Sequence, residues 1–171
     1  MFRARCNVVL GAFVVVVASC GASPADRAPG APTPGARTVV SVVEVTDGDT
    51  IRVNLRGTET PVRLIGIDTP EEDGPYTGEE CFGEEASRFT TGALAGRAIE
   101  LELDIELTDR FDRTLAYVWL DDELFNERLV IEGYAVVATF PPNVRYVERF
   151  RAAEHLARNR SAGLWAACRL D

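Results

Sequence analysis

Three absences limit what this chain of 171 residues can do. It has no lysine, so all 18 basic residues are arginines. Its only histidine, His155, falls in a stretch that predicts a helix, which argues against a cysteine–histidine metal site or a catalytic thiol pair. The apolar run Val8–Ala18 has 11 residues, too few to span a bilayer.

A net positive charge is also missing, because 27 acidic residues face 18 basic ones and give a charge of −9. Residues 1–19 contain Arg3 and Arg5 and no acidic residue, so the remainder has 16 basic and 27 acidic residues, a charge of −11. This balance argues against binding nucleic acid through bulk charge. Any phosphate binding has to come from a few placed arginines and a cation.

Residues 1–20 predict an export signal, in which Arg3 and Arg5 precede the short apolar run. The run ends in Val-Ala-Ser-Cys20, which resembles the bacterial lipobox, where the cysteine is lipidated. The alternative is an ordinary signal peptide cleaved two residues before or after Cys20. Both routes predict an exported protein. The lipobox further predicts a lipid anchor on the outer face of the bacterial cell membrane as the only membrane attachment.

Residues 21–37 are rich in proline, glycine and alanine without apolar periodicity, which predicts a tether. Residues 38–171 predict one folded domain, expected to be a monomer. Alternating or β-branched patterns predict five strands, at residues 39–45, 50–55, 61–67, 99–103 and 114–120. Helical periodicity predicts helices at residues 84–95, 124–131 and 144–159. This order indicates an α+β fold with a mainly β core: a five-stranded, OB-fold-like barrel capped by about three helices.

Residues of the last predicted helix form one apolar face: Val147, Phe150, Ala153, Leu156 and Ala157. We expect this face to pack on the barrel, and the following Gly163-Leu164-Trp165 to pack the tail back onto the domain.

The candidate site is centred on the stretch from Arg63 to Glu71, which covers most of the third predicted strand and the residues that follow it. Asp49 lies in an earlier turn and Arg113 in a later loop. Two aspartates suit a hard metal ion, a glutamate suits a water, and two guanidinium groups suit a phosphate. The combination predicts a phosphodiesterase site.

A set of short motifs resembles the thermonuclease (staphylococcal nuclease-like) family, in order and spacing, over residues 39–165. The matching pieces are Asp47-Gly48-Asp49-Thr50, Arg63 with Asp68-Thr69-Pro70-Glu71, Gly83-Glu84-Glu85-Ala86-Ser87, Thr108-Asp109 with Arg113, Leu115-Ala116-Tyr117, residues 126–133, Pro142-Asn143 and Leu164-Trp165. The resemblance implies an OB-fold barrel and a Ca²⁺-dependent endonuclease that cleaves DNA and RNA with little sequence preference.

The resemblance also implies roles for six residues: metal ligation by Asp49, Asp68 and the backbone carbonyl of Thr69, and catalysis by Arg63, Glu71 and Arg113. Glu71 either takes a proton from the attacking water or orients that water, and the sequence leaves both open. The other reading of each residue is structural: turn or strand-end aspartates, a loop glutamate and surface ion pairs.

The substrate-binding part of the pattern departs from the family. Arg110-Phe111 replaces a lysine–tyrosine pair, which keeps the charge and the ring but loses the hydroxyl. Asp112 replaces a glycine and brings a negative charge close to the substrate phosphate. Phe140 follows a one-residue shortening, so it either stacks on a base or belongs to the core.

Cys81 and Cys168 are the two cysteines of the predicted domain. An even pair in an exported chain predicts a disulfide between them. The leading hypothesis is therefore an exported, Ca²⁺-dependent nuclease. One alternative is a non-catalytic, nuclease-like binding module on a cell-surface lipoprotein, although such a module is expected to lose at least one catalytic residue. A structural surface lipoprotein is a third hypothesis, which only the tether favours.

Overall fold

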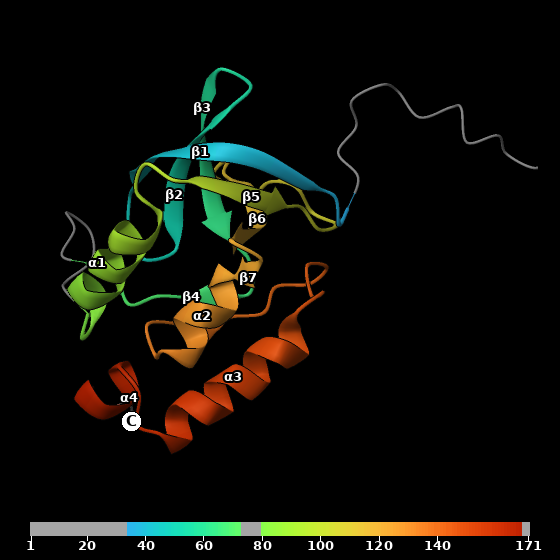
Figure 1. The fold of residues 1–171 in the computed structure, drawn as a ribbon. Helices are drawn as coiled ribbons and strands as arrows, with labels where there is room; N and C mark the ends of the chain where they lie inside the picture. The colour runs from blue at the N-terminus through green and yellow to red at the C-terminus, as the bar shows by residue number, and fades with distance from the viewer. Residues whose placement is uncertain (1–33, 73–79, 169–171) are drawn as a thin grey trace, which may run out of the picture. The chain divides into compact units, whose positions relative to one another are not determined.

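The computed structural model describes residues 34–72 and 80–168. Eight strands and four helices follow one another in these residues (Figure 1): β1 Arg37–Val45, β2 Thr50–Leu55, β3 Thr58–Leu64, β4 Ile67–Asp68, α1 Gly83–Leu94, β5 Ala98–Glu102, β6 Thr114–Leu120, β7 Glu123–Leu124, α2 Phe125–Ile131, β8 Val136–Val137, α3 Val147–Asn159 and α4 Leu164–Ala167. The predicted boundaries of β2 and β6 are confirmed, and those of β1 and β5 are one or two residues off.

Five strands form a closed barrel. The order β3-β2-β1-β5-β6 is antiparallel throughout, and β3 closes the barrel by pairing in parallel with β6. The buried side chains of these strands include Val53, Val62, Leu64, Leu101 and Val118, and β6 is buried on both faces from residue 116 to residue 120. The prediction of an OB-fold-like α+β barrel is confirmed.

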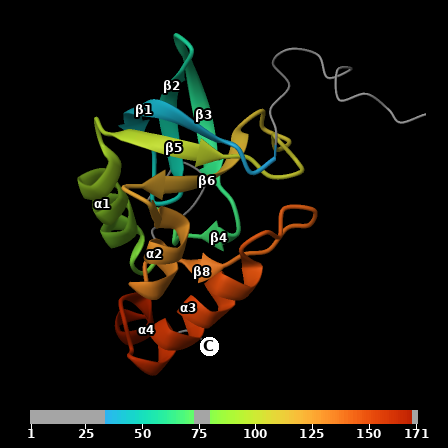
Figure 2. The ribbon, with the colours of Figure 1, turned by 45° about the vertical axis from the view of Figure 1, so that its right-hand side comes forward.

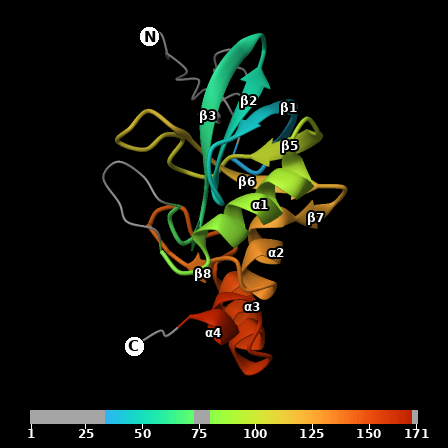
Figure 3. The same ribbon diagram turned by 90° about the vertical axis from the view of Figure 1, so that its left-hand side faces the viewer.

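Helices cover the side and one end of the barrel. In Figures 2 and 3, α1 lies along the side, whereas α2, α3 and α4 lie together at the lower end. Helix α2 lies between β6 and α3. Four helices form rather than about three, since Leu164–Ala167 makes the short helix α4. None of the helices in the described ranges has the length and apolar character needed to cross a membrane.

Two predictions about α3 are wrong. It begins at Val147 rather than near residue 144, because residues 143–145 bond to another loop. Leu156 is 49% exposed, so it does not belong to the apolar face. The buried residues of α3 are Phe150, Ala153 and Ala157.

The third strand also differs from its prediction, which ran without a break to Ile67. Strand β3 ends at Leu64, and the chain turns at Gly66, where φ is +81°. A side chain at Gly66 would lie 2.7 Å from the ring of Phe150, so the turn packs closely on α3. The chain then continues as β4, which pairs with β8. Arg63 and Asp68 therefore lie on two different strands, on either side of a turn.

Candidate active site

The Asp47–Thr50 turn positions the first predicted metal ligand. The Oδ1 atom of Asp47 accepts hydrogen bonds from the backbone N–H groups of Asp49 at 3.0 Å and Thr50 at 2.7 Å. The hydroxyl of Thr90 on α1 donates to the carbonyl of Gly48 at 2.7 Å. Sequence reasoning gave no site role to Asp47 or Thr90, although an aspartate two residues before an Asp-Thr pair is a typical turn former.

Asp49 is a buried carboxylate, with 4% of its surface exposed. Its Oδ2 atom accepts the backbone N–H of Thr69 at 2.9 Å and lies 2.5 Å from Nη1 of Arg63. Burial raises the pKa of Asp49 to about 7, against the opposing effect of the Arg63 guanidinium. The ionised form of Asp49 is therefore short of stabilising partners.

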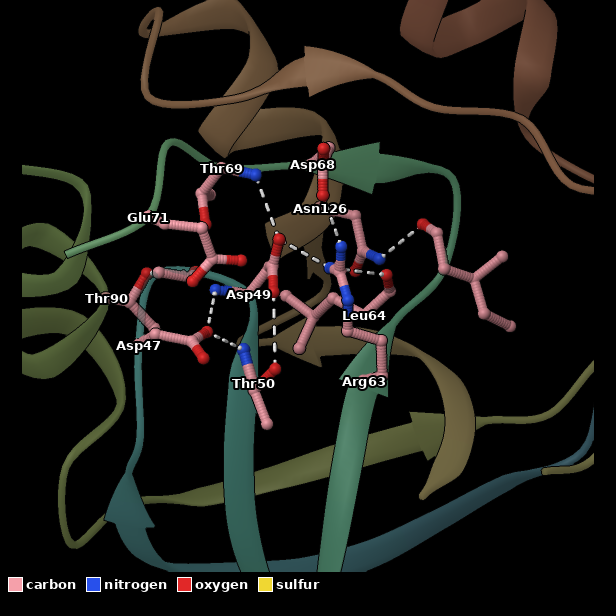
Figure 4. Close-up of polar contacts among 12 residues, drawn as sticks. Asp47, Asp49, Thr50, Arg63, Leu64, Asp68, Thr69, Glu71, Thr90 and Asn126 are labelled. Carbon is pink, nitrogen blue, oxygen red and sulfur yellow. Dashed lines mark hydrogen bonds and ion pairs between the residues drawn. The ribbon is translucent and has the colours of Figure 1, made fainter. Parts of the chain in front are cut away.

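One guanidinium group lies between the two predicted ligand carboxylates. Nη2 of Arg63 lies 2.6 Å from Oδ1 of Asp68, while Nη1 contacts Asp49 (Figure 4). The Asp68 side chain is 55% exposed, so this end of the cluster is open to solvent. Two negative charges share a single positive charge at this point, which leaves the pair of carboxylates with an excess negative charge.

Asn126, a fully buried residue at the start of α2, supports the turn between Arg63 and Asp68 through side-chain hydrogen bonds. Its Nδ2 atom donates to the carbonyl of Ile65 at 2.9 Å, and its Oδ1 atom accepts the N–H of Val118 at 2.8 Å. These bonds attach the turn to the barrel. Asparagine alone gives no signal of this role in a sequence, because only the fold brings its partners together.

Arg113 joins the same cluster from the loop before β6. Its Nη1 atom donates to the Thr50 hydroxyl at 3.4 Å, and that hydroxyl donates to Asp49 at 3.3 Å. A continuous series of polar contacts thus runs from Arg113 through Thr50 and Asp49 to Arg63 and Asp68. Thr69 joins the series through its N–H, which donates to Asp49, so five of the six predicted metal and catalytic residues are connected by polar contacts.

The loop itself is fixed by Asp109. Its carboxylate accepts Nε of Arg113 at 2.7 Å and the backbone N–H groups of Phe111 at 2.9 Å and Arg113 at 3.0 Å. Burial on its own would raise the pKa of Asp109, but these hydrogen bonds bring it below the usual value. Asp109 therefore stays ionised and orients the guanidinium of Arg113.

Glu71 is exposed and lies beside the same cluster, with its side chain directed toward Asp49 and Asp47 in Figure 4. Partial burial raises the pKa of Glu71, and the negative charges of Asp47 and Asp68 raise it further. A carboxylate with a raised pKa is better able to accept a proton near neutral pH than an ordinary glutamate. Thr69, whose carbonyl is the third predicted ligand, directly follows Asp68 in the sequence and is buried.

A cavity of about 460 Å³ opens beside the cluster. Aliphatic, charged and aromatic residues line it, and the charged and aromatic ones include Arg63, Asp68, Arg110, Phe111, Arg113 and Phe140. Phe111 is 63% and Phe140 is 73% exposed, so the alternative that Phe140 belongs to the core is wrong. The guanidinium of Arg110 lies over the ring of Phe111, at 4.7 Å from its centre.

The donor set fits a hard divalent cation. Asp49 and Asp68 offer carboxylate oxygens, the ligands that Ca²⁺ prefers, and a cation would relieve their excess negative charge. Over residues 34–72 and 80–168, no three His, Cys, Asp or Glu side chains gather in a metal-binding arrangement. The predicted set needs only two such side chains, because its third member is a backbone carbonyl.

Comparisons with known proteins identify the family. A family described as staphylococcal nuclease homologue matches residues 61–167. The thermonuclease of Staphylococcus hyicus is 43% identical over 125 residues, which is 73% of this chain and 74% of that protein. This chain belongs to the staphylococcal nuclease family. The thermonuclease of Staphylococcus intermedius is also 43% identical, over 72% of this chain and 74% of that protein. Endonuclease YncB of Bacillus subtilis strain 168 is 34% identical, over 78% of this chain and 67% of that protein.

Two further predictions concern cysteines. Cys81 and Cys168 form the predicted disulfide, with their Cα atoms 5.8 Å apart. Cys20, the predicted lipidation site, lies outside the described residues, as do the rest of the export signal and most of the tether.

Proposed function

We propose that this protein is an exported, Ca²⁺-dependent nuclease that hydrolyses phosphodiester bonds of DNA and RNA with little sequence specificity. The arrangement of Asp49, Arg63, Asp68 and Arg113 in one polar network beside an open cavity supports this proposal most strongly. The names of its relatives, thermonuclease and endonuclease, point to the same reaction.

The two arginines would bind the scissile phosphate from two elements of the barrel. Arg63 comes from β3 and Arg113 from the loop before β6, and strands β3 and β6 are neighbours. A guanidinium group donates two parallel hydrogen bonds to phosphate oxygens and stabilises the negative charge that builds on them in the transition state. Asp109 orients Arg113 for this role.

Asp49, Asp68 and the backbone carbonyl of Thr69 would hold Ca²⁺, whose charge, when it is bound, polarises the phosphate and orients water. Arg63 is the present counter-charge of both aspartates. Once the aspartates have another positive partner, Arg63 no longer has to neutralise them, and its donors become available to phosphate. Glu71 would then accept a proton from the attacking water or orient it.

The exposed rings of Phe111 and Phe140 suit the remaining part of a nucleic acid. Both line the cavity, and a base can stack on either ring without a hydrogen-bonding requirement. Stacking of this kind tolerates every base, which fits a nuclease with little sequence preference. Arg110 adds a positive charge at the same edge.

The location of the protein is part of the proposal. The export signal in residues 1–20, with its lipobox-like end at Cys20, supports a lipid-anchored protein outside the cell, or else a secreted one. The disulfide is consistent with an oxidising compartment.

The deciding experiment is incubation of the purified protein with single-stranded DNA and with RNA, in Ca²⁺ and in excess chelator. We expect cleavage of both substrates in Ca²⁺ and none in chelator. Absence of cleavage in Ca²⁺ would contradict the nuclease proposal, whereas equal cleavage in chelator would contradict its dependence on the metal ion.

A further inference from the structure

The backbone of Glu71 is bound on both sides by a segment that follows it in the chain. Its N–H donates to Oε2 of Glu80 at 3.1 Å, and its carbonyl accepts the N–H of Glu80 at 3.0 Å. Gly83 packs against the same carbonyl so closely that a Cβ atom there would lie 2.3 Å from the oxygen. The position of Glu71 therefore depends on residues 80–83.

The Cys81–Cys168 disulfide attaches this segment to the C-terminal end of the described chain. The next residue, Phe82, has a φ of +79°, which a phenylalanine adopts only when its surroundings impose it. Its ring stacks on Tyr134, with the ring centres 5.5 Å apart. Residues 80–83 are thus fixed by the disulfide of Cys81 and by the aromatic contact of the next residue, Phe82.

The other end of the disulfide is itself attached to the body of the domain. Cys168 directly follows α4, and its N–H donates to the carbonyl of Leu164 at 2.9 Å. The N–H of Leu164 donates to the carbonyl of Gly133, just after α2, at 2.9 Å. Helix α2 in turn supports the turn between Arg63 and Asp68 through Asn126. The disulfide therefore connects the Glu71 loop with the elements that carry the rest of the site.

We infer that the Cys81–Cys168 disulfide positions Glu71 for the reaction, through the hydrogen bonds between Glu71 and Glu80. This inference rests on the proposed function, in which Glu71 handles the attacking water. Loss of the disulfide removes the covalent constraint on residues 80–83 and lets Glu71 move relative to Asp49 and Arg63. Displacement of a reacting group by about 1 Å is enough to slow a reaction roughly 10²-fold. Substrate binding by the arginines does not depend on this loop.

The test is the double variant Cys81→Ser/Cys168→Ser, assayed with single-stranded DNA and Ca²⁺ well below its melting temperature. We expect kcat to fall at least ~10-fold while KM changes less than ~3-fold. The matched control is Ala157→Gly, which removes a buried methyl group from α3 and lowers the melting temperature, and it is expected to keep its kcat. An unchanged kcat in the double variant would overturn the inference.

Variants of Glu80 test the connecting step. Glu80→Ala removes the acceptor for the Glu71 N–H, and we expect kcat to fall at least ~5-fold at constant KM. Glu80→Gln keeps an oxygen acceptor at the same place and is expected to restore kcat to within ~2-fold of the parent. Equal activity of the Ala and Gln variants would overturn the role of Glu80.

A readout that does not need activity separates failure of this inference from failure of the proposed function. Amide hydrogen exchange at Glu71 and Glu80 reports the two hydrogen bonds directly. In Cys81→Ser/Cys168→Ser we expect both amides to exchange at least ~10-fold faster, while the amide of Val118 in the barrel is unchanged. Unchanged exchange at Glu71 and Glu80 would overturn the inference even in a fully active enzyme. Inactivity of the parent protein would instead refute the proposed function.

Discussion

Two clusters of carboxylates in this barrel have different surroundings. In the first, at the candidate site, Asp49 and Asp68 share the guanidinium group of Arg63. In the second, Glu102 and Asp104 lie at and just after the end of β5, each 3% exposed. Glu102 accepts hydrogen bonds from Nε1 of Trp119 at 2.8 Å and from the hydroxyl of Tyr146 at 3.0 Å.

The second cluster is also well supplied with positive charge. Nε of Arg145 lies 3.4 Å from Glu102 and its Nη2 lies 3.5 Å from Asp104, while Nε of Arg37 lies 3.7 Å from Glu102. Asp104 further accepts the hydroxyl of Tyr117 at 3.1 Å. Burial raises the pKa of Tyr117, and the neighbouring Asp104 raises it further, so the hydroxyl remains a donor at neutral pH.

The difference between the clusters distinguishes a structural site from a reactive one. Two carboxylates with two arginines and three neutral donors need nothing from outside, and they bind β5, β6 and the start of α3 to one another. At the candidate site, two carboxylates share one arginine, which leaves an excess of negative charge. Such an excess is costly at the buried Asp49 unless a ligand relieves it, which is how a fold prepares a cation site.

The largest expected effect is a loss of catalytic rate in variants that remain folded. Arg63→Ala and Glu71→Gln should each lower kcat at least ~10²-fold, because each removes one preorganised group from the reacting centre. Far-ultraviolet circular dichroism should show that both variants remain folded. Arg52→Ala is the matched control, since Arg52 lies on β2 and its ion pairs with described residues, at 3.9 and 3.7 Å, are exposed. A loss of only a few-fold in Arg63→Ala would mean that the site is assigned to the wrong residues.

In the second cluster we expect a smaller effect, on the stability of the protein and not on its catalytic rate. Tyr117→Phe removes a donor from buried Asp104 and should lower the free energy of unfolding by about 1–3 kcal/mol, with kcat unchanged. Urea unfolding measures the first quantity and the cleavage assay the second. In Tyr134→Phe, where the hydroxyl makes no hydrogen bond to a described residue, we expect a change within about 0.5 kcal/mol. A loss of activity in Tyr117→Phe would remove the contrast between the clusters.

Protonation of Asp49 should make both the stability of the protein and its affinity for Ca²⁺ depend on pH. The pKa of Asp49 is raised from 3.8 to about 7 in the folded protein, so folding favours its protonated form. Without Ca²⁺, its contribution to stability is therefore lost as the pH rises from about 4 to about 7. Ca²⁺ binds the ionised form, so its apparent affinity should rise roughly tenfold per pH unit below 7 and level off above it. Calorimetric titration between pH 5.5 and 8 measures this slope, and a flat affinity would contradict the role of Asp49.

Much of the barrel was predictable from the sequence because its strands are either rich in β-branched and apolar residues or alternate between apolar and polar residues. The pattern in residues 50–55 and 114–120 predicts β2 and β6 to the residue. The same reasoning failed at Ile65–Ile67, because an unbroken apolar run looks like one strand even where Gly66 turns the chain. Strands β4, β7 and β8 have two residues each, too few to show any period.

The candidate site was predictable as a list of residues but not as a network. Motif spacing points to Asp49, Arg63, Asp68 and Arg113, yet the sharing of Arg63 by two aspartates follows only from the turn at Gly66. The cluster of Glu102 and Asp104 gave no signal at all. In the sequence, Glu102 is simply the polar position of an alternating strand, and its donors Trp119 and Tyr146 come from β6 and from just before α3.

The most direct test of this account is a Ca²⁺ titration of the ¹⁵N-labelled protein, followed through its backbone amide signals. The account predicts saturable shifts at Asp49, Asp68 and Thr69, and none at Glu102 or Asp104. Shifts at Glu102 and Asp104, or no shift at Asp49 and Thr69 at millimolar Ca²⁺ with a nucleotide present, would contradict it.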